Sequence, residues 1–137
     1  AVDISPECIQ QVEAVALKWR VMEKVFAEVG DAHRLDFPDS TFDAVVQAEL
    51  WEHIPDPRAI IEEGLRVLKP GGYLITTTPI GHHHFDPMHM GPVDGGWDEA
   101  TLKELLKPWE GQVKRFETIA EEGAEPSCYL VVLEKPR

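Results

Sequence analysis

A run of histidines is the most reactive feature of the sequence: His82, His83 and His84 are consecutive, and His89 follows nearby. In an extended segment His82 and His84 point to the same side of the chain. With either Asp86 or His89 they could hold a metal ion, as in two-histidine, one-carboxylate sites. Imidazoles also accept protons near neutral pH. We predict that these residues form no metal site and that any metal bound to them is adventitious.

Two aspartates stand directly after stretches that end like strands. Asp3 follows Ala1 and Val2, and Asp31 follows the alternating segment 24–29 and Gly30. A carboxylate at the carboxyl end of a strand can accept hydrogen bonds from two vicinal hydroxyl groups, and open α/β sheets bind ligands at that end. The alternatives are a solvated surface aspartate for Asp3 and a turn-capping aspartate for Asp31. We favour a binding role for both.

The elements that must position these residues follow from the apolar periodicity. Ser5 and Pro6 suit the start of a helix, and apolar residues at helical spacing continue it to about residue 20. A second helix starts after residues 56–57 and ends sharply at residues 69–72, and a short third helix follows residues 97–98 and stops at Pro108. Strands are predicted at 24–29, 42–48, 73–78, 113–119 and 128–134, with a long loop over 79–97.

This order of elements predicts an α/β fold. Strands that alternate with helices favour a mostly parallel sheet covered on both faces, and the last two strands, joined without a helix, favour an antiparallel hairpin at one edge. A length of 137 residues is that of one domain, 1–137, with a core of its own.

Composition excludes several classes of partner. The formal net charge of −12 argues against binding to nucleic acid or to an anionic membrane surface, because both select basic proteins. No apolar run is long enough to span a bilayer. Cys8 and Cys128 form no disulfide framework or metal spacing, and we interpret them as reduced thiols of a cytoplasmic protein.

Taken in order, several short motifs resemble those of class I S-adenosylmethionine-dependent methyltransferases, in particular the small-molecule branch that includes enzymes of ubiquinone and menaquinone biosynthesis. The resemblance covers most of residues 1–79 and is specific as a set, whereas the last third matches in element order only. The motifs are Asp3-Ile4-Ser5-Pro6, Gly30-Asp31-Ala32, the segment 37–43 (FPDSTFD), the segment 52–57 (EHIPDP) and the segment 66–72 (RVLKPGG).

The resemblance implies a Rossmann-like sheet of strand order 3-2-1-4-5-7-6 that begins with a strand, a glycine-rich turn and a helix. No G-x-G-x-G occurs in this sequence, so we expect an N-terminally truncated, incomplete domain without its first strand and helix. Strand 42–48 should then pair with strand 73–78 on one side. On the other side it should recruit strand 24–29 or a second copy of the chain, giving a homo-oligomer. The 137-residue chain alone should bind the cofactor weakly or not at all and be inactive.

The resemblance also implies site residues. Asp3 would bind the cofactor ribose, Ile4 would pack on the adenine face unless it is simple core packing, Asp31 would accept from the adenine amino group, and the Ala32 amide would donate to a ring nitrogen. The region from Gln47 to Trp51 would touch the methionine end and the acceptor. The expected set is Asp3, Ile4, Asp31, Ala32 and Gln47 for the cofactor, Glu49, Trp51, Phe85 and Met88 for the substrate, and His82, His84 and His89, unranked, as candidate bases.

Trp51, from this set, and the neighbouring Glu52-His53 pair also allow a structural interpretation. Trp51 could equally form a lid over the core. The Glu52-His53 pair is typical of the family, but a buried histidine that holds a loop is more common than a catalytic base. The predicted loop 79–97 starts at the carboxyl end of strand 73–78, where the family places acceptor-binding segments.

The implied function is methyl transfer from S-adenosylmethionine to a small-molecule acceptor. The sulfonium already activates the methyl group, so the protein must align the acceptor and exclude water. The alternative from another class is a non-catalytic Rossmann-like module that serves binding or assembly. A metal-binding protein that uses the histidine run is a third hypothesis.

Overall fold

The computed structural model describes residues 1–83 and 96–137. Within these residues the chain forms two compact units, Ala1–Pro38 and Asp39–Arg137, which we call unit 1 and unit 2. A single domain over 1–137 stays a prediction. No helix in the described part of the chain has the length and apolar character needed to cross a membrane.

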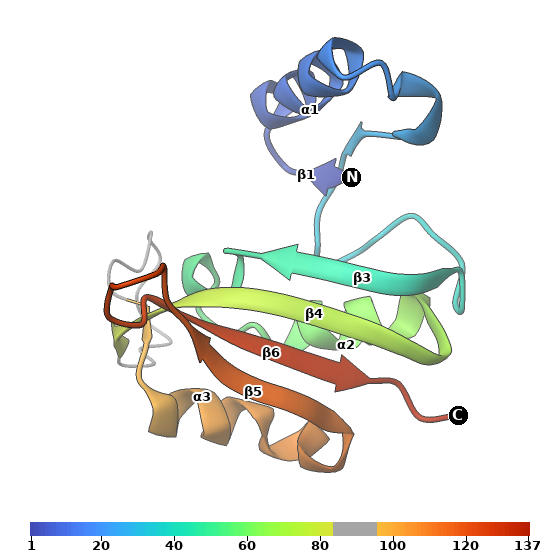
Figure 1. Ribbon diagram of the computed structural model, residues 1–137. Helices are drawn as coiled ribbons and strands as arrows, with labels where there is room; N and C mark the ends of the chain where they lie inside the picture. The colour runs from blue at the N-terminus through green and yellow to red at the C-terminus, as the bar shows by residue number, and fades with distance from the viewer. Residues whose placement is uncertain (84–95) are drawn as a thin grey trace. The chain divides into compact units, whose positions relative to one another are not determined.

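Unit 1 contains two short parallel strands and one long helix (Figure 1). Strand β1 (Val2–Asp3) pairs with β2 (Glu28–Val29). Helix α1 (Pro6–Lys18) starts where predicted, and the Ser5 hydroxyl accepts a hydrogen bond from the Cys8 amide at 3.3 Å. The strand predicted over 24–29 is shorter, because the 3₁₀ turn η1 (Met22–Lys24) occupies its start and β1 offers only two residues for pairing.

Unit 2 is built on a four-stranded sheet of order β3-β4-β6-β5. Strands β3 (Phe42–Ala48) and β4 (Leu68–His83) are parallel, and β6 (Cys128–Glu134) runs antiparallel to both β4 and β5 (Val113–Ile119). The α/β class, the parallel pair and the C-terminal hairpin are therefore confirmed. Strand β4 is longer than predicted and takes in the first residues of the predicted loop.

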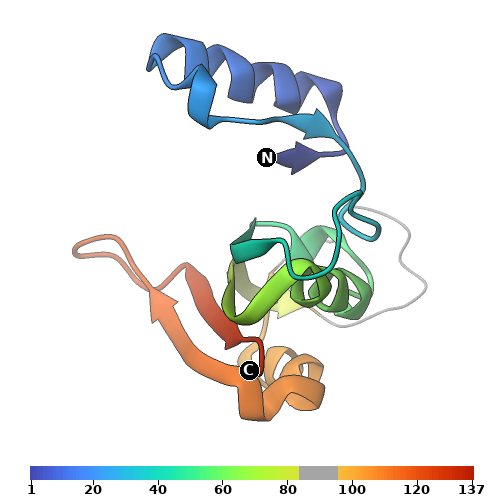
Figure 2. The same cartoon turned by 90° about the vertical axis from the view of Figure 1, so that its right-hand side faces the viewer.

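The helices of unit 2 lie on one face of this sheet (Figures 1 and 2). Helix α2 (Arg58–Val67) connects β3 to β4, and α3 (Glu99–Leu106) with the 3₁₀ helix η3 (Lys107–Gln112) precedes β5. The connection from β3 to β4 and the connection from β4 to β5 each join two parallel strands. Both lead in the same direction across the sheet. Right-handed crossovers therefore place both helices on the same face. Within unit 2 the helices therefore cover one face, and a sheet covered on both faces stays a prediction.

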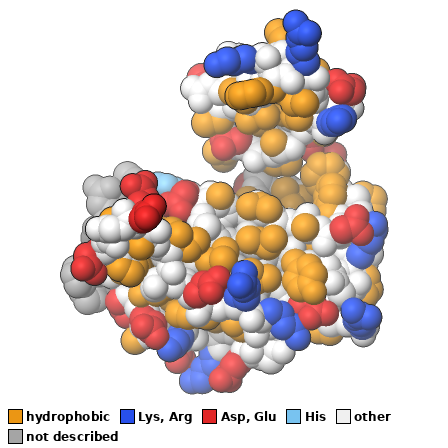
Figure 3. Space-filling view, viewed as in Figure 1, with side chains coloured by type: hydrophobic (Ala, Val, Ile, Leu, Met, Phe, Trp, Pro, Cys, Tyr) orange, Lys and Arg blue, Asp and Glu red, His pale blue; other side chains and the backbone are white. Residues whose placement is uncertain are grey.

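Side chains divide between the two faces row by row. Gln47, Thr76 and Val131 are cross-strand neighbours on the helix-covered face, and all three are buried. The next row, Val46, Ile75 and Val132, lies on the opposite face, where Val46 is 66% exposed. Figure 3 shows hydrophobic side chains gathered over the strands on this second face.

The C-terminal end of α2 is closed by the last residues of the chain. Lys135 donates from Nζ to the carbonyl oxygens of Arg66 (3.2 Å) and Leu68 (2.7 Å), which stabilises the negative end of the helix dipole. Gly71, with φ of +79°, makes the predicted turn, and its amide donates to the Lys135 carbonyl oxygen.

Strand β3 is an edge strand. Its pairing with residues 73–78 is confirmed, in the register Ala44 to Tyr73 through Ala48 to Thr77. The prediction that strand 24–29 moves in on its other side is wrong, because β2 pairs with β1 instead. Within the described residues no strand pairs with that second edge.

Candidate functional site

Asp3 and Asp31 lie at the carboxyl ends of the two neighbouring parallel strands of unit 1. Asp3 is opposite Val29 in the β1–β2 pair, and the Gly30 amide donates to the Asp3 carbonyl oxygen at 2.9 Å. The pairing thus brings two carboxylates, 28 positions apart in the sequence (31 minus 3), to one edge of a sheet. This is the edge at which open α/β sheets bind ligands.

Both aspartates have the same local geometry. One oxygen of each, Oδ1, accepts a hydrogen bond from the backbone amide two residues later: Ser5 for Asp3 at 2.8 Å and His33 for Asp31 at 2.9 Å. Such a turn fixes the carboxylate against the backbone. The second oxygen of each carboxylate, Oδ2, has no hydrogen-bond partner among the described residues, so each strand end presents one oriented acceptor.

Ile4 stands between the Asp3 carboxylate and helix α1, and its side chain is 75% exposed. Simple core packing of Ile4 is therefore ruled out in this structure. Gly30 lies against Val2: a Cβ atom at Gly30 would be 2.8 Å from Val2 Cγ1. The absence of a side chain at Gly30 lets β1 and β2 end side by side, which sets the spacing of the two carboxylates.

Asp31 has a second partner in its own turn. The Nδ1 atom of His33 lies 2.8 Å from Asp31 Oδ1. Hydrogen bonds from the His33 amide and the His33 ring lower the pKa of the Asp31 carboxyl below its ordinary value, so the group is a carboxylate at neutral pH. Asp31 also lines a cavity of about 120 Å³ whose apolar wall consists of Val2, Val29 and Leu35.

Gln47 and Trp51 form a buried pair in unit 2. Gln47 donates from Nε2 to the Ile60 carbonyl oxygen and accepts from Trp51 Nε1, both at 2.8 Å. Trp51, in the 3₁₀ helix η2 (Trp51–His53), is fully buried. The polar atoms of the Gln47 side chain thus contact protein partners, and Trp51 is part of the core in this structure. The lid-over-the-core interpretation matches this geometry.

Around them the strand ends carry acidic groups. Glu49 is exposed and has a φ of +48°, and its amide donates to the Thr77 carbonyl oxygen at 2.9 Å. Glu52 is buried, where Oε2 accepts from Thr78 Oγ1 at 2.9 Å and Oε1 lies 3.6 Å from His53 Nε2. The buried member of the Glu52-His53 pair is the glutamate, whereas the His53 side chain is 59% exposed. The interpretation of a buried histidine is therefore wrong here.

Most of the predicted acceptor-side residues fall outside the described part of the chain. His82 and His83 end strand β4, while His84, Phe85, Asp86, Met88 and His89 lie outside the described residues. In residues 1–83 and 96–137 no three His, Cys, Asp or Glu side chains converge on a point that could hold a metal. Because His84, Asp86 and His89 are not among these residues, the absence of a metal stays a prediction.

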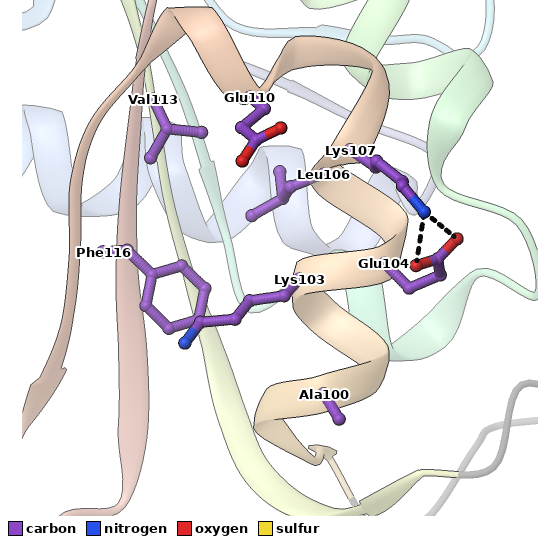
Figure 4. A pocket seen from close by; sticks show the side chains of 8 residues that line it. All are labelled: Ala100, Lys103, Glu104, Leu106, Lys107, Glu110, Val113 and Phe116. Atoms are coloured by element: carbon purple, nitrogen blue, oxygen red, sulfur yellow. Dashed lines mark hydrogen bonds and ion pairs between the residues drawn. The ribbon is translucent and has the colours of Figure 1, made fainter.

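A larger cavity, of about 370 Å³, lies between α3 and β5 (Figure 4). Its two lysines are paired with glutamates of α3: Lys103 with Glu99 and Lys107, the first residue of η3, with Glu104. None of the predicted site residues lines it. Its lining residues are Ala100, Lys103, Glu104, Leu106, Lys107, Glu110, Val113 and Phe116.

Comparison with known proteins decides the family. A family model described as a methyltransferase domain matches residues 1–76, which is more than half of the chain. The chain belongs to this family. The matched residues include Asp3, Asp31, strand β3 and the 3₁₀ helix η2. All of these parts of the candidate site therefore lie within the region that the methyltransferase family model covers.

Individual relatives agree with this assignment. The chain is 34% identical over 86 residues to norajmaline N-methyltransferase from Rauvolfia serpentina, a match that covers 63% of the chain and 29% of that protein. It is 32% identical over 77 residues to a ubiquinone biosynthesis O-methyltransferase from Alkalilimnicola ehrlichii, covering 56% of the chain and 31% of that protein. The chain thus spans less than a third of the length of these two relatives.

The fold of the methyltransferase domain is confirmed by a solved structure. An S-adenosylmethionine-dependent methyltransferase from Methanosarcina mazei aligns with a TM-score of 0.69 at 24% identity, over 98% of this chain and 80% of that one. The likeness extends over the C-terminal third, which the family model does not reach. It confirms the Rossmann-like class of the fold, including the antiparallel hairpin.

Two features of the site were not predicted from the sequence. One is the contact between His33 and Asp31, and the other is the burial of Glu52 against Thr78. The first had a local signal, because a histidine two positions after a turn-forming aspartate can reach its carboxylate. The second depends on the register of β3 and β4, which the sequence of either strand does not reveal.

Proposed function

We propose that the protein transfers a methyl group from S-adenosylmethionine to a small-molecule acceptor. The observation that carries this proposal is the pair of oriented carboxylates, Asp3 and Asp31, at the ends of neighbouring parallel strands. The named relatives are methyltransferases of small molecules, which favours an enzyme over a non-catalytic binding module.

The residues of unit 1 fit the adenosine part of this cofactor. Asp3 can accept from the ribose hydroxyl groups, and the exposed Ile4 offers an apolar surface for the adenine ring. Asp31 can accept from the adenine amino group, and the Ala32 amide can donate to the neighbouring ring nitrogen. When bound, S-adenosylmethionine supplies a methyl group that its positively charged sulfur has already activated.

The remaining contacts belong to the end of the sheet in unit 2. Here we propose that Gln47 acts by holding Trp51 in place. Glu49, exposed after the end of β3, would face the acceptor, with Phe85 and Met88 as an apolar wall. His82, His84 and His89 stay the unranked candidates for a base that takes a proton from the acceptor. We assign no metal to the reaction.

Binding of the demethylated product tests this function directly. We expect saturable binding of S-adenosylhomocysteine to the whole protein in isothermal titration calorimetry, because the product keeps the ribose and adenine that unit 1 would hold. Adenosine should compete, and guanosine should not, since its ring edge does not match Asp31 and Ala32. Absence of any binding at millimolar concentration would show that the proposed cofactor is wrong.

A second copy of the chain is the partner that we propose for the β3 edge. An edge strand offers unpaired backbone groups that another strand can join, and Val46 adds an exposed apolar side chain there.

We expect light scattering to show a concentration-dependent dimer of residues 1–137. Val46→Lys should shift it to monomer, because a charge on an edge strand opposes pairing. Val15→Lys, on the exposed surface of α1, should not. A monomer at every concentration would contradict the proposal.

The compartment proposed for the protein is the cytoplasm. Cys8 and Cys128 are both free thiols in the structure, as is usual in reducing compartments.

A further inference from the structure

His33 is an exposed histidine that belongs to none of the predicted sites, yet it contacts one of their carboxylates. Its amide and its Nδ1 atom both approach Asp31 Oδ1, at 2.9 and 2.8 Å. The amide contact depends on the backbone alone and would form with any residue at position 33. The ring contact depends on the histidine and adds a second donor to the same oxygen.

This double contact leaves the two oxygens of Asp31 unequal. Oδ1 accepts hydrogen bonds from two donors. Rotation of the Asp31 carboxylate about the Cβ–Cγ bond would break both of them. Oδ2 has no partner among the described residues, and the backbone of Ala32 follows directly. The Arg34 amide donates to the Asp31 carbonyl oxygen at 3.0 Å, which closes the turn from the other side. The turn therefore presents a fixed acceptor, Oδ2, and the next residue in the chain, Ala32, has a backbone amide that could serve as a neighbouring donor.

An acceptor next to a donor matches one edge of adenine. The amino group of adenine donates, and the adjacent ring nitrogen accepts. Hypoxanthine has the reverse pattern at the same positions, with a carbonyl oxygen in place of the amino group and a protonated ring nitrogen. A carboxylate that can turn freely discriminates between them less well than a fixed one, because a free carboxylate can swing away from the carbonyl oxygen.

We propose that His33 is a positioning residue that fixes the Asp31 carboxylate and thereby sets the preference of the site for adenine over hypoxanthine. This rests on the proposed function, since it concerns the same cofactor site. His33 itself touches the carboxylate and not the nucleobase. The cavity next to Asp31 has an apolar wall of Val2, Val29 and Leu35, and its charged lining residues besides Asp31 are Glu28, Arg34 and Asp36.

The alternative is that His33 only stabilises the local turn. In that case its removal would change the stability of unit 1 but not the ratio of affinities for two nucleobases. Glu28, Arg34 and Asp36, the other charged residues that line the cavity, are not substituted in any His33 variant. A selectivity ratio therefore separates positioning from a purely structural role.

The first arm of the test needs no cofactor. In residues 1–137, carboxyl-detected NMR should show that His33→Ala raises the pKa of Asp31 toward its ordinary value, because the ring hydrogen bond that helps to lower it is lost. His33→Asn keeps a donor at the position of Nδ1 and should restore much of the lowering. An Asp31 pKa that is the same in all three proteins would overturn the proposal.

The second arm measures selectivity. Calorimetry of the whole protein with S-adenosylhomocysteine and S-inosylhomocysteine should show that His33→Ala lowers the adenine preference by about threefold, a size typical of exposed charge-assisted contacts. His33→Asn should keep the preference, as should His53→Ala, which removes an exposed histidine of unit 2.

The outcomes separate the two proposals. If wild type and His33→Ala both bound S-adenosylhomocysteine and preferred it over S-inosylhomocysteine by the same factor, the proposed role of His33 would be wrong. The proposed function would be unaffected. A wild-type protein that binds neither compound would overturn the proposed function and the role of His33 with it.

Discussion

Replacing Asp3 with alanine is expected to weaken binding of S-adenosylhomocysteine to the whole protein by about a hundredfold, because two hydrogen bonds between a carboxylate and ribose hydroxyls would be lost. The side chain is already oriented by the Ser5 amide at 2.8 Å, so the wild-type protein does not have to order it on binding. Calorimetry gives the dissociation constants directly.

Two further variants identify the cause of the expected loss. Asp3→Asn keeps an oxygen that can accept from the Ser5 amide but removes the charge, so its affinity should lie between those of wild type and Asp3→Ala. Glu13→Ala removes an exposed acidic residue of α1 and should bind like wild type. If Asp3→Ala bound as tightly as wild type while circular dichroism showed a folded protein, Asp3 would be a solvated surface residue.

Replacing Trp51 with alanine is expected to lower the free energy of unfolding by about 3–5 kcal/mol, the usual cost of removing a large buried aromatic side chain. Trp51 is fully buried, and its loss would also leave Gln47 Oε1 without its donor. Urea denaturation followed by circular dichroism measures the change.

Trp19 provides a matched control, since this tryptophan of the C-cap of α1 is 70% exposed. Trp19→Ala should change the free energy of unfolding by no more than about 0.5 kcal/mol. The same pair of variants tests the sequence-based assignment of Trp51 to the substrate. A Trp51→Ala protein of unchanged stability that no longer binds an acceptor would assign Trp51 to the substrate site and contradict a core role.

The strands of unit 2 could be predicted well because their signal is local. Residues 42–48, 113–119 and 128–134 alternate or run apolar between clear breakers, and β3, β5 and β6 have these same bounds. The start of α1 could be predicted equally well, because Ser5 as the N-cap and Pro6 as the first helical residue favour a helix start through local contacts only. The strand predicted over 24–29 failed at its first residues, since a strand needs a partner and β1 is only two residues long.

Burial at the candidate site was harder to foresee. Trp51 and Glu52 are adjacent and both buried, although one is aromatic and the other acidic. Their burial depends on Gln47 and Thr78, which come from different strands and meet them only after β3 and β4 have paired. The sequence resemblance marked this segment as part of a site, but it could not distinguish residues that contact a ligand from residues that support those contacts.

The carbonyl oxygen of Arg66, at the end of α2, accepts hydrogen bonds from both ends of unit 2. Ser40 donates to it from its amide at 3.1 Å, and Lys135 donates from Nζ at 3.2 Å. The entry and exit of the chain in this unit therefore meet at one helix end, where a few residues would suffice to join them. Unit 2 thus has the geometry that tolerates circular permutation: its sheet could be opened at another loop and closed here with its strand order unchanged.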